Sequence, residues 1–241
     1  MRVYLDNNVF VDVEDGLYSF DDFVSNNLRL EYYYSDAHMS ELLNGLVKSI
    51  PGLKDRRLTT IKTICGRRFL AQDDSFQRVF LAECDPKQAF ENSVRFGFMR
   101  GYINQLAEKS TPNRQGILNE LSWDAREVGS YEPYEILGKI EEKLLESKYH
   151  FGIKDYLFAS EAYTGRTIFS CLFNLLDMVG YRKDKNSVAR LYDSSHAFYA
   201  QKCNILVSND SRMRLKTEAV YHYLQIKTRV MDTRSFLALV E

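Results

Sequence analysis

The sequence predicts an α/β fold in three layers, with helices on both faces of a central, mostly parallel sheet. Short apolar strands alternate with helical segments at both ends of the chain, which is the pattern of a parallel sheet covered on both sides. Residues 51–185 differ, because their long stretches carry helical periodicity. We therefore expect a core formed by residues 1–50 and 186–241, with residues 51–185 as an all-helical insertion.

The composition is that of an ordinary soluble globular protein. Of 241 residues, 45% are hydrophobic and 27% are charged. The apolar runs are far shorter than a membrane span and the sixth residue is an acid, so we expect no membrane partner, no signal peptide and a cytoplasmic location. The four cysteines have no paired C-x-x-C spacing, which argues against a zinc ribbon or a disulfide framework.

The charges are distributed unevenly along the chain. Residues 1–50 hold three basic and nine acidic side chains, whereas residues 182–216 hold eight basic and three acidic ones. Carboxylates for cations beside basic groups for phosphates are what a metal-dependent phosphodiesterase needs. Such runs are more often a mixed, solvated surface, so the charge pattern alone does not decide the function.

The first fifty residues predict two strands and a helix. The short apolar segment 2–6 ends in an acid and is typical of a buried strand, and a second strand is expected at 30–34. Ser35 is a suitable N-cap for a helix with apolar residues at helical spacing from Met39 to Ile50. Pro51 and Gly52 end this helix.

The rest of the chain predicts further helices and two more strands. In the middle, 136–149 and 156–181 have helical periodicity. Near the end we expect helices at 187–202, 213–224 and 233–239, with strands at 204–208 and 228–231. The alternation of these last elements again indicates a parallel sheet.

Four acids stand at positions where a parallel sheet would gather them. Asp6 ends the first strand and Asp210 ends a later one, so both are expected at the carboxyl edge of the sheet, where such folds bind ligands. Glu41 lies in the second turn of the helix after the second strand. Asp193 shares a helical face with Ala197 and Ala200, which would let that helix approach the sheet closely.

Clustered carboxylates repel one another unless cations neutralise them. Mg²⁺ or Mn²⁺ suits a ligand set made only of oxygens. Two such ions, roughly 3.5–4 Å apart, activate a water and stabilise the leaving oxygen of a phosphodiester. Each acid alone is a weak signal, because an acid at a strand end is more often a turn former.

The order and context of the four acids resemble the PIN-domain family of nucleases. Members open with a strand running into Asp-Thr/Ser-Asn, and later have a helix bearing Glu-Leu, a helix with Asp and small residues, and a strand ending in Thr-Asn-Asp. The matching segments here are Leu5-Asp6-Asn7-Asn8, Glu41-Leu42, Asp193 to Ala200, and Ser208-Asn209-Asp210, followed by a last strand and helix over 228–239. The resemblance covers about residues 1–50 and 186–241.

The resemblance implies a metal-dependent nuclease and assigns residues to its site. The metal-binding and catalytic acids would be Asp6, Glu41, Asp193 and Asp210, with Asp6 central. Asn8 and Ser208 would support the site by hydrogen bonds. The sequence departs from the family in having Asn7 where a hydroxyl residue is usual, Ser208 where threonine is commoner, and a much larger middle.

Several nearby side chains have less certain roles. Arg212, Arg214 and Lys216 follow Asp210 directly and are candidates to contact substrate phosphates. His38 and His196 sit beside two of the acids in sequence, but a surface or satisfied histidine is the commoner case.

The predicted function is a metal-dependent endoribonuclease that uses Mg²⁺ or Mn²⁺. Its substrate would be single-stranded or structured RNA, with single-stranded DNA and a homo-oligomeric or inhibitory protein partner left open. The alternative is a catalytically weak PIN-like scaffold that binds RNA or a protein through its insertion. A phosphotransferase of the haloacid-dehalogenase type is disfavoured, since it needs a second Asp where this chain has Asn8.

Overall fold

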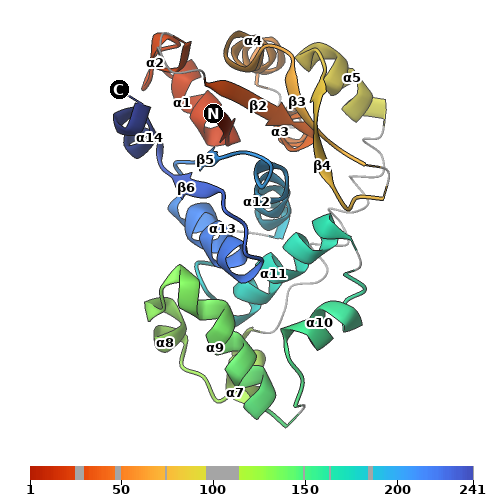
Figure 1. The fold of residues 1–241 in the computed structure, drawn as a ribbon, viewed down its shortest axis with the longest axis vertical. Helices are drawn as coiled ribbons and strands as arrows, with labels where there is room; N and C mark the ends of the chain where they lie inside the picture. Colours follow the sequence, from red (N-terminus) through yellow and green to blue (C-terminus); the bar gives the residue numbers. More distant parts are fainter. Residues whose placement is uncertain are drawn as a thin grey trace.

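A computed structural model describes residues 1–24, 30–46, 50–73, 75–95, 114–148, 150–162, 164–183 and 187–240. Its centre is a six-stranded sheet with the strand order β4-β3-β2-β1-β5-β6 (Figure 1). The strands are β1 Arg2–Leu5, β2 Glu31–Ser35, β3 Arg68–Gln72, β4 Val79–Glu83, β5 Ile205–Val207 and β6 Arg229–Met231. All neighbouring strands are parallel except β3 and β4, which form an antiparallel hairpin.

Helices fill the connections between these strands. Those of the first hundred residues are α1 Asn7–Glu14, α2 Asp21–Val24, α3 Asp36–Leu46, α4 Leu53–Cys65 and α5 Pro86–Arg95. The middle contributes α7 Arg114–Glu120, α8 Ala125–Ser130, α9 Pro133–Glu146, α10 Ile153–Ala159 and α11 Gly165–Val179. The last part contributes α12 Ser187–Ala200, α13 Ser211–Tyr223 and α14 Thr233–Val240.

The alternation of side chains along each strand separates the core into two halves. Val3 and Leu5 of β1 pack into one apolar cluster, whereas Tyr4 between them packs into the other. The first cluster is closed by residues of α1, α4, α5 and α14, and the second by residues of α9, α11, α12 and α13. The mostly parallel sheet with helices on both faces confirms the predicted α/β class.

The prediction that residues 51–185 are all helical is wrong for residues 68–83. These form the β3–β4 hairpin, and β3 pairs in parallel with β2 through Tyr34 and Phe69. The side chain of Asp73 accepts hydrogen bonds from the backbone N–H groups of Gln77 and Arg78, which favours the tight turn between the two strands. Residues 51–95 thus extend the sheet and cover it, while residues 96–113 lie outside the described part.

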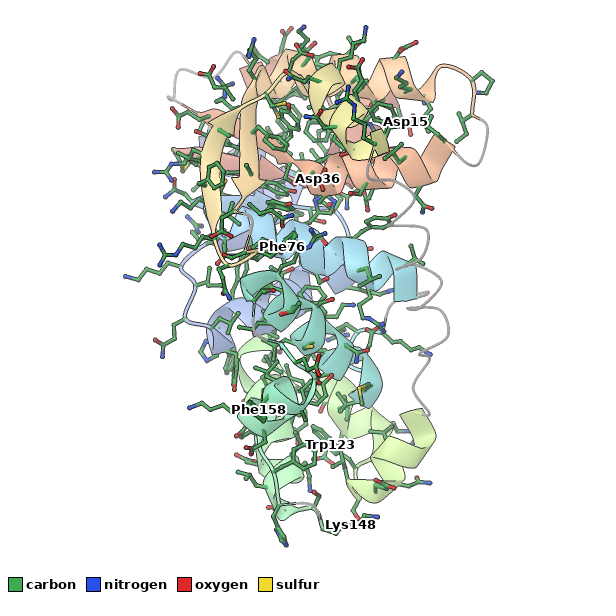
Figure 2. The ribbon with its side chains drawn as sticks, turned by 90° about the vertical axis from the view of Figure 1, so that its right-hand side faces the viewer. Asp15, Asp36, Phe76, Trp123, Lys148 and Phe158 are labelled. Carbon is green, nitrogen blue, oxygen red and sulfur yellow. The ribbon has the colours of Figure 1, made fainter. Side chains whose placement is uncertain are left out.

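The remaining helices of the middle are attached to the sheet through shared core packing. Trp123, Ile136 and Leu172 belong to the same apolar cluster as Tyr4 of β1 and Leu206 of β5. Figure 2 shows the helical half below the sheet, with Trp123 inside it and Phe158 at its surface.

The segment 156–181 is not one helix, because α10 ends before Ser160 and Thr164 caps the start of α11. None of the helices in the described ranges is long and apolar enough to cross a membrane.

A buried group of charges also joins the helices on this side of the sheet. Asp177 of α11 lies 3.4 Å from Arg190 of α12 and 3.3 Å from Lys216 of α13, measured from carboxylate oxygen to cationic nitrogen. Buried charges are tolerated when they are paired in this way. The group fixes α11 beside α12, the helix that carries His196.

Candidate functional site

The carboxyl ends of three neighbouring strands form the edge at which the candidate site lies. Leu5 at the end of β1 is in register with Val207 at the end of β5, and the backbone N–H of Asp6 donates to the carbonyl of Val207 over 2.8 Å. On the other side of β1, β2 leads directly into α3, which carries Glu41. The parallel topology therefore brings together residues that are about 200 positions apart in sequence.

Asp6 is the most firmly held acid of this edge. One carboxylate oxygen accepts the backbone N–H of Asn7 at 2.7 Å, and the other accepts the Asn8 amide at 2.6 Å and the Ser208 hydroxyl at 2.8 Å. The side chain is buried, and burial raises its pKa. The nearby Glu41 carboxylate raises the pKa further, while His196 and the hydrogen bonds oppose this shift.

The hydrogen bonds expected from Asn8 and Ser208 are present, and they extend into a wider network. Asn8 also donates to the Ser208 hydroxyl at 3.0 Å, and its carbonyl accepts the backbone N–H of Asn209 at 3.0 Å. The Asn209 side chain donates to Asp12 of α1 and accepts the backbone N–H of Thr233 at the start of α14. Asp6 is thus positioned by residues from both halves of the predicted core.

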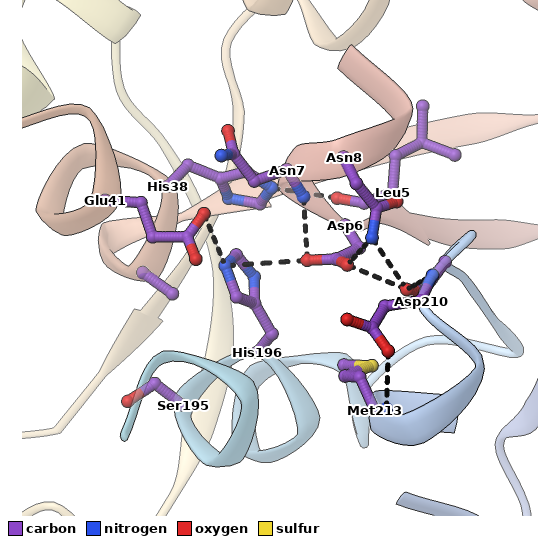
Figure 3. Close-up of polar contacts among 12 residues, drawn as sticks. Leu5, Asp6, Asn7, Asn8, His38, Glu41, Ser195, His196, Asp210 and Met213 are labelled. Atoms are coloured by element: carbon purple, nitrogen blue, oxygen red, sulfur yellow. Dashed lines mark hydrogen bonds and ion pairs between the residues drawn. The ribbon is translucent and has the colours of Figure 1, made fainter. Parts of the chain in front are cut away.

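His196 of α12 lies between Asp6 and Glu41, with its Nε2 atom directed at both (Figure 3). Nε2 is 3.7 Å from an Asp6 oxygen and 3.5 Å from Glu41 Oε2. Burial favours the neutral ring, but the two carboxylates outweigh it and raise the pKa of His196 above its usual value. Nε2 and Glu41 Oε2 are buried and make no hydrogen bond within the described residues.

A second buried layer orients His196. The Tyr4 hydroxyl lies 2.8 Å from His196 Nδ1 and 2.6 Å from the Ser35 hydroxyl. The backbone N–H of Ser35 donates to His38 Nδ1, so His38 Nε2 donates to the Leu5 carbonyl at 2.8 Å. Burial lowers the pKa of His38 well below its usual value, so this ring is neutral. Because the Tyr4 hydroxyl contacts Nδ1 of His196, Nε2 is the ring nitrogen of His196 that faces the two acids.

The other two predicted acids have different settings. Asp210 is exposed and caps α13, where one carboxylate oxygen accepts the N–H groups of Arg212 at 2.8 Å and Met213 at 3.1 Å. Asp193 is half-buried on α12, three residues before His196. Within the described residues, no three or more His, Cys, Asp or Glu side chains are grouped so that they could hold a metal ion. The structure therefore brings Asp6 and Glu41 together around His196, without a single four-acid cluster.

The three predicted phosphate contacts have different environments. Lys216 is completely buried beside Asp177 and the ring of Phe173, so the prediction that it contacts substrate is wrong. The sequence did not reveal that Lys216 lies on the inward face of α13, because it shows only a basic residue close to Asp210. Arg214 donates to the Ser208 carbonyl at 2.7 Å and lies 3.9 Å from Asp232, which makes it a support of the site. Arg212 is exposed.

Arg57 of α4 is a contributor that the sequence did not indicate. Its buried guanidinium pairs with Glu14 of α1 through two nitrogens, 2.5 and 3.2 Å from the carboxylate oxygens, and also donates to the Asn7 side chain. Asn7 stands where the PIN-domain nucleases that the sequence resembles usually have a hydroxyl residue. An asparagine there gives Arg57 an acceptor next to Asp6.

The sequence carried partial signals for these contributors. Asp193 and His196 are one helical turn apart, and small residues on the same helix predicted a close approach to the sheet. Tyr4 lay in a strand recognised as buried. Nothing linked Arg57 to Asn7, because the two lie on different helices and their contact depends on tertiary packing.

The edge presents two carboxylates and one imidazole, although no three His, Cys, Asp or Glu side chains of the described residues form a metal-binding group. It offers carboxylate oxygens from Asp6 and Glu41 and a ring nitrogen from His196, and Glu41 Oε2 and His196 Nε2 are buried without a hydrogen bond. Carboxylate oxygens are the ligands that Mg²⁺ and Mn²⁺ prefer, whereas an imidazole is more typical of zinc, copper or iron sites. No family model, curated protein or solved structure matches this chain.

Proposed function

We propose that this protein is a Mg²⁺- or Mn²⁺-dependent nuclease that hydrolyses phosphodiester bonds, with RNA as its substrate. The observation that carries the proposal is the convergence of Asp6 and Glu41 on His196 at the carboxyl edge of the sheet. A buried acid and a half-buried one that face a buried ring nitrogen, with polar atoms that lack hydrogen bonds, are typical of functional sites.

Each residue has a role that follows from its position. Asp6 and Glu41 are the cation-binding carboxylates, and Asn8 and Ser208 hold Asp6 in place. Asp193 and Asp210 complete the acidic edge, as the resemblance to PIN-domain nucleases implies. A divalent ion held by these carboxylates would supply an activated water and charge stabilisation for the leaving oxygen. His196 holds a proton, or offers a lone pair, at Nε2 between the two carboxylates.

A second function is favoured by one observation. The described residues contain no three-ligand metal group, which is what a catalytically weak PIN-like scaffold would show. Such a protein would bind RNA or a protein partner through its helical middle. The preference for RNA over DNA comes from the family resemblance, because no residue here is recognisable as a reader of the 2′-hydroxyl.

Cleavage of a labelled, mixed-sequence RNA tests the proposal. Wild type is incubated with Mn²⁺, Mg²⁺ or EDTA, beside Asp6→Asn, Glu41→Gln and the control Glu142→Gln, which removes an exposed carboxylate on α9. We expect metal-dependent cleavage in wild type and the control, reduced at least about 100-fold in the two site variants. A DNA of the same sequence shows whether the sugar matters. Cleavage that EDTA does not stop, or that survives Asp6→Asn, would rule the proposal out.

A further inference from the structure

Arg166 of α11 contacts α12, the helix that carries His196, and is held by residues of two other elements. One guanidinium nitrogen is 3.3 Å from the side-chain oxygen of Gln72 in β3, and another is 3.4 Å from the Ser195 hydroxyl in α12. The backbone N–H of Arg166 also donates to the Phe76 carbonyl in the hairpin turn, at 3.2 Å. Its position is therefore set by the hairpin and by the helix that carries His196.

The start of α11 is packed closely against the hairpin turn. A side chain at Gly165 would meet the backbone oxygen of Gln77 at 2.5 Å, so the helix end and the hairpin turn are in close contact. The N–H of Gly165 donates to the Gln77 side chain at 3.2 Å. Arg166 is consequently preorganised, and little conformational entropy is lost when its guanidinium binds a ligand.

Among the residues that the structure describes, no carboxylate pairs with the guanidinium of Arg166. Both side-chain contacts of this half-buried residue are with neutral oxygens. In contrast, the two arginines that are most deeply buried in the described ranges are paired with acids, Arg57 with Glu14 and Arg190 with Asp177. A guanidinium in a neutral setting with unused N–H groups is suited to an anion, above all to the oxygens of a phosphate.

Through Ser195, Arg166 contacts α12 next to the residue that faces the two acids. Ser195, its partner, immediately precedes His196, whose Nε2 lies 3.5 Å from Glu41. Figure 3 shows Ser195 and Glu41 on the same side of His196, away from Asp210. A nucleic-acid strand that placed one phosphodiester at Asp6 and Glu41 could thus present a neighbouring phosphate to Arg166.

We propose that Arg166 binds a backbone phosphate of a single-stranded nucleic acid next to the bond that is cleaved. This deepens the proposed function and depends on it for the identity of the ligand. It gives the middle of the chain a direct part in substrate binding, since α11 belongs to the predicted insertion. The contact reads no base, so it contributes affinity and register without sequence preference.

Binding without cleavage tests this inference. Fluorescence anisotropy of a labelled single-stranded RNA in EDTA is measured from low to moderate salt, for wild type, Arg166→Gln and Arg166→Lys. Arg126→Gln is the matched control, because it removes an exposed arginine from α8 in the far helical part. Loss of one phosphate contact on a single strand lowers the slope of log K against log salt by about 0.7, which is about fivefold in affinity near 0.1 M salt.

We expect Arg166→Gln to show this loss, Arg166→Lys to keep most of the salt slope, and Arg126→Gln to match wild type. The same result with single-stranded DNA would show that the contact is to phosphate alone. Equal RNA affinity in wild type and folded Arg166→Gln, or an equal loss in the Lys variant together with a lower unfolding temperature, would overturn the inference. So would a wild type that binds neither nucleic acid. Failure of the nuclease proposal is scored separately, by cleavage with Asp6→Asn.

Discussion

Asp6 is the residue on which most of the electrostatic interactions of the site act. A buried carboxylate is costly unless hydrogen bonds and opposite charge compensate it. Asn7, Asn8 and Ser208 supply three hydrogen bonds, and His196, 3.7 Å away, acts against the rise in the pKa of Asp6. Because the raised pKa of His196 reflects its two acidic neighbours, the three groups form one electrostatic unit.

Asp210 has two roles that substitution can separate. As the N-cap of α13 it satisfies two backbone N–H groups, and Asn caps a helix about as well as Asp, whereas Ala costs about 0.5–2 kcal/mol. We therefore expect Asp210→Ala to lower the free energy of unfolding by that amount and Asp210→Asn to leave it nearly unchanged. Urea unfolding measures this difference.

The same two variants also test whether Asp210 takes part in metal-dependent cleavage. If Asp210 belongs to the cation site, both lose metal-dependent RNA cleavage by at least about tenfold, since the amide carries no charge. Cleavage at the wild-type rate in Asp210→Asn would show that Asp210 serves α13 alone.

At the level of single residues, the sequence predicted those features that depend on neighbouring positions in the chain. A strand that ends in Asp6 and a strand that ends before Asp210 were visible, and their common edge followed from the parallel topology. The buried state of Lys216 was not visible, because a lysine is normally exposed and only the tertiary structure shows Asp177 beside it. The position of His196 between the acids was hidden for the same reason.

Among the elements, those with clear periodicity or end signals were predictable. The strands β1, β2, β5 and β6 and the helices α3, α12, α13 and α14 lie close to their expected ranges. The β3–β4 hairpin was missed because five-residue strands flanked by helices leave a weak pattern, and pairing with β2 decides their state. This hairpin carries Gln72, and so the surroundings of Arg166 could not be foreseen.

For the whole molecule, the shared core predicts that the sheet and the helical middle unfold together. The single tryptophan, Trp123, is buried in the helical part, and its cluster includes Leu206 of β5. Leu206→Ala creates a cavity in that cluster and is expected to cost about 2–5 kcal/mol. We expect the midpoint of unfolding by Trp123 fluorescence to coincide with that by far-ultraviolet circular dichroism, and both to fall equally in the variant.

A different outcome would indicate that the sheet and the helical middle are separate folding units. If Leu206→Ala shifted only the circular dichroism transition and left the Trp123 transition in place, the helical middle would be an independent folding unit. The inference that α11 holds Arg166 in a fixed position relative to the sheet would then no longer be supported.

The most direct test of the central claim is Mn²⁺ binding, since it needs no knowledge of the substrate. Mn²⁺ is titrated into wild type, Glu41→Gln and the control Glu142→Gln, and free Mn²⁺ is measured by electron paramagnetic resonance. We expect saturable binding to wild type and the control, weakened at least about tenfold when the Glu41 carboxylate is removed. Absence of saturable binding to wild type, or equal binding to Glu41→Gln, would contradict it.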